Sequence, residues 1–104
     1  MTSKPILIIG PPASGKTHIA LAIMGLFHNA WVQTNASDAA KIANWAMHPH
    51  IKLVIVENVP DALFLSALWS DLKKFEAVPA FVFTSQSDIE APKEFSVIHC
   101  NNKY

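Results

Sequence analysis

The stretch Gly10-Pro11-Pro12-Ala13-Ser14-Gly15-Lys16-Thr17 decides how the rest of this chain is interpreted. It matches the pattern G-x-x-x-x-G-K-[ST]. The four apolar residues 6–9 precede it and favour a strand, and the apolar residues of 16–28 recur at three- and four-residue intervals, as in an amphipathic helix. A glycine-bearing turn between a strand and a helix directs backbone N–H groups at an anion on the helix N-terminus. The stretch therefore predicts a phosphate-binding loop.

The residues of this loop have separate predicted roles. Gly10 and Gly15 allow the chain to wrap tightly, and the two prolines have no N–H to offer. The donors are therefore expected from Ala13, Ser14, Gly15, Lys16, Thr17 and His18. The Lys16 ammonium would contact the outer phosphates, and the Thr17 hydroxyl would bind the Mg²⁺ that accompanies a nucleoside triphosphate. The alternative is an ordinary Gly/Pro turn with a solvated lysine.

Length and composition indicate one compact domain over residues 1–104. Hydrophobic residues make up 51% of the 104 and charged residues 15%, which is typical of a globular core. Eight basic residues balance eight acidic ones, so no net charge attracts nucleic acid or an anionic membrane, and any contact with nucleic acid is expected to be indirect. The single Cys100 excludes an internal disulfide, and 6–9 is too short to cross a membrane. We expect a cytoplasmic protein.

Strands and helices are predicted to alternate along the chain. Strands are expected at 6–9, 30–34, 53–56, 80–83 and 95–100, and helices at 16–28, 37–46 and 60–75. The runs 53–56 and 80–83 are continuously apolar, as in strands of a parallel sheet that helices cover on both faces. These patterns predict an α/β fold, a three-layer sandwich around a mostly parallel five-stranded sheet.

Polar residues follow two of these apolar strands, Glu57-Asn58 after one and Thr84-Ser85-Gln86 after the other. Ligands of parallel sheets bind beyond the carboxyl ends of the strands, where the phosphate-binding loop is also expected. Glu57 is the candidate that holds Mg²⁺ or polarises the nucleophile, and Thr84, Ser85 and Gln86 are candidates that sense a phosphate. The alternatives are a solvated strand-end carboxylate and ordinary turn residues.

With these motifs the chain resembles the P-loop NTPases that carry an additional strand between the phosphate-loop strand and the acidic strand. It looks most like a reduced superfamily III helicase or AAA+ ATPase core, with Gly10 to Thr17 as the strongest match. The resemblance implies ATP and Mg²⁺ as ligands. It also implies catalytic roles for Lys16, Glu57, Asn58 and Thr84, nucleotide contacts from Ser85 and Gln86, and Mg²⁺ bound through Thr17 and Glu57.

The chain departs from the pattern of these relatives at three points. Their acidic strand usually ends in Asp-Glu or Asp-Asp, whereas this chain has Glu57-Asn58. Either Glu57 fills the metal-associated position and Asn58 replaces the catalytic acid, or Glu57 is the catalytic acid and Val56 occupies the metal-associated position. Gln86 stands where a sensor Asn is expected. The relatives also use an arginine to stabilise the transferring phosphoryl group, and this chain contains none. A second copy or a larger ATPase partner would have to supply it.

Two functions are open on this basis: a slow Mg²⁺-dependent ATPase, and a non-catalytic nucleotide-binding module that acts through a partner. Glu57 favours the first, whereas Asn58 and the missing arginine favour the second. A small-molecule kinase ranks third, because no lid insertion or arginine cluster is present to close over two substrates.

Overall fold

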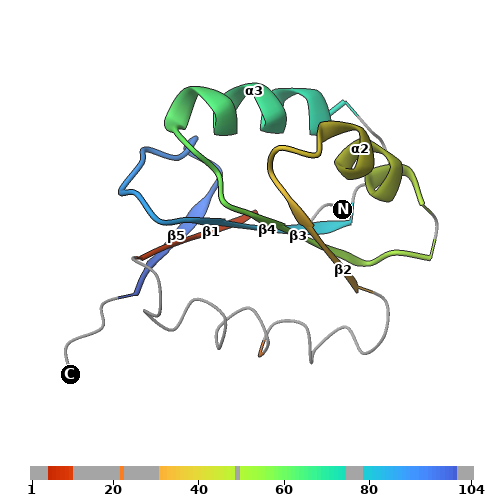
Figure 1. Cartoon of the computed structure of the whole chain (residues 1–104), viewed down its shortest axis with the longest axis horizontal. Coiled ribbons are helices and arrows are strands. Elements are labelled where there is room, and N and C mark those ends of the chain that lie inside the picture. The colour runs from red at the N-terminus through yellow and green to blue at the C-terminus, as the bar shows by residue number, and fades with distance from the viewer. Residues whose placement is uncertain (1–4, 11–21, 23–30, 49, 75–78, 101–104) are drawn as a thin grey trace.

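The chain forms one parallel β-sheet with helices packed against it (Figure 1). The computed structural model describes residues 5–10, 22, 31–48, 50–74 and 79–100. Its strands are β1 (Ile6–Ile9), β2 (Trp31–Asn35), β3 (Leu53–Glu57), β4 (Ala80–Ser85) and β5 (Ser96–His99). They lie in the order β2-β3-β4-β1-β5, and every pair of neighbours is parallel. The predicted α/β fold with a mostly parallel five-stranded sheet is confirmed within this part of the chain.

Two helices, α2 (Ala39–Met47) and α3 (Ala62–Leu72), lie side by side over the same face of the sheet (Figure 1). The helix predicted at 60–75 is shorter than expected at its start, because Asp61 is its N-cap. The Asp61 backbone is extended, and its Oδ1 accepts the Phe64 N–H at 2.7 Å, so the helix begins after Pro60. Phe75 and the predicted helix at 16–28, apart from the helical Ala22, lie outside the described residues.

The second predicted helix starts differently from the sequence-based expectation. Asp38 occupies the N-cap position of α2 but makes no side-chain capping bond. Instead the Asn35 Oδ1 accepts hydrogen bonds from the Ser37 N–H at 3.0 Å and the Ser37 hydroxyl at 2.9 Å. Asn35 and Ser37 therefore stabilise the turn between β2 and α2. The sequence Ser37-Asp38 indicated the start of a helix, but it did not show that Ser37 bonds Asn35 in the turn while Asp38 makes no capping bond.

The side chains of the inner strands are buried on both faces of the sheet, as the continuously apolar runs predict. Leu7, Val54 and Phe83 belong to a cluster on the face that carries α2 and α3. Ile8, Ile55 and Val82 alternate with them along the strands and form a second cluster, which includes Cys100. Cys100 is buried, with only 7% of it exposed.

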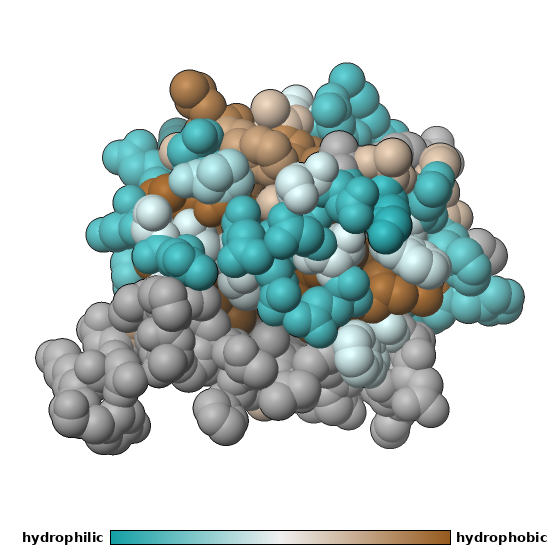
Figure 2. Space-filling view, in the orientation of Figure 1, coloured by the Kyte–Doolittle hydropathy of each residue, from teal (hydrophilic) through white to brown (hydrophobic). Residues whose placement is uncertain are grey.

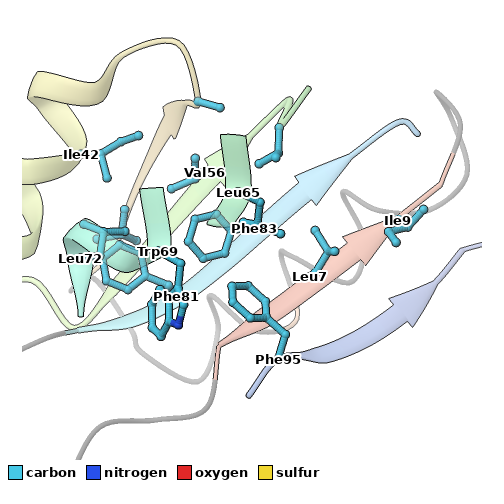
Figure 3. Packing of buried hydrophobic residues seen from close by; sticks show 13 residues of the cluster. Leu7, Ile9, Ile42, Val56, Leu65, Trp69, Leu72, Phe81, Phe83 and Phe95 are labelled. Carbon is cyan, nitrogen blue, oxygen red and sulfur yellow. The ribbon is translucent and has the colours of Figure 1, made fainter. Parts of the chain in front are cut away.

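Aromatic rings dominate the larger cluster, between α3 and the sheet (Figure 3). The Trp69 ring meets Phe81, Phe83 and Phe95 edge-on, with centroids 6.0, 6.3 and 5.4 Å away. Its Nε1–H donates to Glu94 Oε1 at 2.9 Å, and the same oxygen lies 3.7 Å from Lys73 Nζ. Trp69 thereby links α3 to the segment before β5.

The surface over the two helices is mixed in polarity (Figure 2). Polar residues form a band across the viewed face, and hydrophobic residues gather above it, over the helices. Leu63 on α3 is 84% exposed and accounts for part of the apolar surface of that helix. Within the described segments, no helix combines the length and the hydropathy that a bilayer crossing requires.

Candidate functional site

The first residue of the predicted phosphate-binding loop is tied to the end of β4. The Gly10 N–H donates to the Ser85 carbonyl at 3.0 Å, and Ile9 is the register partner of Ser85. On its other side β4 pairs with β3, where Phe83 is opposite Val56. The carboxyl ends of β1, β4 and β3 therefore form one edge of the sheet. Gly10 follows β1 at this edge, Thr84 lies near the end of β4, and Glu57 is the last residue of β3.

Asn58 turns the chain sharply at the end of β3. Its φ is 63°, in the left-handed region that asparagine tolerates better than most residues with a Cβ. In this conformation the Asn58 N–H donates to Thr84 Oγ1 at 3.4 Å, and the Val59 N–H donates to the Thr84 carbonyl at 2.9 Å. The turn after β3 is thus bonded to the end of β4, which brings the predicted site residues Asn58 and Thr84 together.

The Ser85 hydroxyl also connects the turn after β3 to the loop after β4. It donates to the Val59 carbonyl at 2.8 Å and accepts the Ser87 N–H at 3.2 Å. Only 1% of Ser85 and 6% of Thr84 are exposed. The two hydroxyls that the sequence offered as phosphate sensors are therefore buried and hydrogen-bonded within the protein, and their contact with a nucleotide stays a prediction.

Replacement of Ser85 by alanine is expected to lower the free energy of unfolding by about 1–3 kcal/mol, because the Val59 carbonyl and the Ser87 N–H lose their partner. Urea unfolding followed by circular dichroism measures the change. The control is Ser70→Ala at an exposed site on α3, which should shift the free energy by less than about 0.5 kcal/mol. Equal effects of the two substitutions would contradict the connecting role of Ser85.

Glu57 is the last residue of β3 and is half-buried. Its backbone carbonyl accepts the Ala36 N–H at 2.7 Å, and Asn35 is its register partner on β2. Among the residues described, none forms a hydrogen bond or an ion pair with the Glu57 carboxylate. The side chain is therefore available to a cation or to a water molecule at this edge.

The residues present at this edge fit Mg²⁺ only as an ion shared with phosphate. No group of three or more His, Cys, Asp or Glu side chains that would hold a metal occurs in the described segments. Mg²⁺ commonly binds proteins through one or two carboxylates, with phosphate oxygens and water completing its shell. Glu57 matches this mode, whereas the other predicted ligand, Thr17, lies outside the described residues.

An open pocket of about 410 Å³ lies between the turn after β3 and the start of the loop after β4. Its described lining consists of Asn58, Val59, Pro60, Gln86 and Ser87. Val59, Pro60 and Ser87 were not predicted as site residues from the sequence. Their positions directly after Asn58 and Gln86, in the turns that follow β3 and β4, could have indicated them. Gln86 is exposed at the pocket, while the predicted phosphate contacts from Ala13 to His18 lie outside the described residues.

Comparison with known protein families found no family model that matches the chain, and comparison with curated proteins found no significant match. The function of this chain is therefore inferred from the motif and from the edge formed by β1, β4 and β3.

Proposed function

We propose that this chain binds a nucleoside triphosphate with Mg²⁺ through residues 10–18 and hydrolyses it slowly. The resemblance to P-loop NTPases favours ATP. The proposal includes the three-layer P-loop architecture, a cytoplasmic location and a second copy or larger ATPase partner that donates an arginine.

The position of β4 between β1 and β3 is the observation that carries this proposal. It joins Gly10, the start of the G-x-x-x-x-G-K-[ST] motif, to the strand that ends in Thr84 and Ser85. It also sets Glu57, whose carboxylate has no described partner, at the next strand end. A predicted anion cradle after β1 and a carboxylate at the end of β3, on either side of β4, support the binding of a triphosphate with its metal. A strand in this position is also what the resemblance implies.

The second candidate is a nucleotide-binding module without catalysis, and Asn58 favours it. A carboxamide cannot accept the proton of an attacking water, and Asn58 stands where the relatives carry the catalytic acid if Glu57 takes their metal-associated position. Its backbone N–H already bonds Thr84 Oγ1, so the residue has a structural role that does not depend on catalysis.

Phosphate release from Mg-ATP distinguishes the two candidates. For the ATPase, Glu57→Gln is expected to slow release about 100-fold, the lower range for a lost acid–base group. Asn58→Asp is expected to raise it about tenfold or more, because a second carboxylate is restored in a backbone conformation that aspartate also tolerates.

The matched control is Glu90→Gln, which removes a carboxylate at an exposed site on another loop and should leave the rate unchanged. Binding of Mg-ATP with release that none of these substitutions alters would reject the ATPase and support the module. Binding is measured separately by titration calorimetry.

A further inference from the structure

The pocket between Asn58 and Ser87 is large enough for a small molecule. The pocket measures about 410 Å³, within the range of roughly 300–1,000 Å³ that is typical of small-molecule sites. It lies at the carboxyl edge of the sheet, one residue beyond Glu57, where ligands of parallel sheets bind.

The walls of this pocket are fixed before any ligand arrives. The turn after β3 and the loop after β4 are connected by hydrogen bonds from Asn58, Val59, Ser85 and Ser87, at distances between 2.8 and 3.4 Å. These bonds use the hydroxyls of Thr84 and Ser85, so those groups are committed to the framework. A site on such a framework loses little conformational freedom on binding.

The polar side chains of the described lining are the carboxamides of Asn58 and Gln86 and the hydroxyl of Ser87. All three are uncharged and belong to exposed residues. A carboxamide both donates and accepts hydrogen bonds, as does a hydroxyl, so these groups suit a neutral ligand with hydroxyl groups. An anionic ligand would find no cation among the described lining residues.

We propose that this pocket binds a small, uncharged hydroxyl compound that accepts the terminal phosphoryl group of the bound nucleotide. This inference depends on the nucleotide binding proposed above, and it raises the small-molecule kinase above its rank from sequence alone. The acceptor oxygen forms a bond to the γ-phosphorus as the bond from that phosphorus to the β-phosphate oxygen breaks. The diphosphate leaves, and the hydroxyl proton passes to a water molecule.

Ribose and ribose 5-phosphate form a matched pair of probes, since they share hydroxyls and differ in charge. With γ-labelled Mg-ATP, ribose is expected to collect label as a sugar phosphate, about tenfold more than ribose 5-phosphate collects. Ribose should also raise the melting temperature of the protein saturated with a non-hydrolysable ATP analogue, which is a readout of binding without turnover. Glycerol and uridine serve as smaller and larger neutral probes.

Ser87→Glu tests whether these effects arise in this pocket. The added carboxylate is expected to reduce label transfer to ribose and the ribose-dependent thermal shift about tenfold, a loss equivalent to about 1.4 kcal/mol. The control is Ser66→Glu, at an exposed site on α3, which should preserve both effects.

Calorimetry with Mg-ATP alone separates this inference from the function on which it depends. If no nucleotide binds, the proposed function itself fails. If the nucleotide binds but all label appears as inorganic phosphate and no neutral probe shifts the melting temperature, the acceptor site is rejected. Equal transfer to ribose and ribose 5-phosphate, or transfer that Ser87→Glu leaves intact, would also overturn the proposal.

Discussion

Replacement of Lys16 by alanine is expected to weaken Mg-ATP binding at least about 100-fold. Hydrogen bonds to charged groups contribute roughly 1.5–3 kcal/mol each, and a lysine ammonium that reaches two phosphates makes two of them. Loss of both corresponds to a 100-fold or greater rise in Kd. Titration calorimetry with Mg-ATP measures the change, and circular dichroism checks that the variant is folded.

Lys52→Ala is the matched control for this experiment. Lys52 is exposed and immediately precedes β3, at the opposite end of that strand from Glu57, so its loss changes the net charge equally without touching the candidate site. It should alter Kd less than about twofold, the range expected of a distant and screened charge. Equal Kd values for the two variants would contradict a phosphate-binding role for Lys16.

Replacement of Trp69 by alanine is expected to lower the free energy of unfolding by about 3–5 kcal/mol. The substitution empties a site enclosed by Phe81, Phe83 and Phe95 and removes the hydrogen bond to Glu94. A loss of this size is a large fraction of the roughly 5–15 kcal/mol that stabilises a typical domain. Urea titration followed by circular dichroism measures it, with thermal unfolding as a second measurement.

Trp69→Phe divides this effect into packing and hydrogen bonding. Phenylalanine keeps an aromatic ring in the cluster but has no N–H for Glu94, which is left with Lys73 at 3.7 Å. We expect a loss of about 1–2 kcal/mol for this variant, from the missing bond and the smaller ring. A loss below about 1 kcal/mol for Trp69→Ala would show that the aromatic cluster is not central to stability.

The sequence was sufficient to predict the strands and the helices α2 and α3 of the described segments, because their signals are local. The apolar runs at 53–56 and 80–83 predicted β3 and β4, and the helical spacing of apolar residues that include Leu63 and Leu72 predicted α3. The buried side of α3 was predicted only in part, since Leu65, Trp69 and Leu72 are buried whereas Leu63 is exposed. Small errors occurred at element ends, where a single contact decides the boundary. The bond from Asp61 Oδ1 to the Phe64 N–H is one such contact, and it begins the helix later than Pro60 suggested.

The candidate site was predicted only in part, because its geometry depends on which strands are neighbours. Glu57, Asn58 and Thr84 were identified as strand-end polar residues, and they do lie at one edge of the sheet. Their partners could not be predicted from local patterns. Nothing in the run of hydroxyl residues indicates that Ser85 is buried against the Val59 carbonyl, or that Asn58 adopts a positive φ to bond Thr84.

The strand order also determines when this fold becomes complete. The first strand, β1, pairs only with β4 and β5, which are made of the last residues that the structure describes. During synthesis on the ribosome, β1 therefore emerges long before either neighbour exists. Partners that far apart in sequence slow folding, because a long loop must close before any pairing stabilises it. The apolar β1 therefore cannot form its native pairs until β4 and β5 have been synthesised, which makes chaperone binding to residues 6–9 an expected step in the biogenesis of this protein.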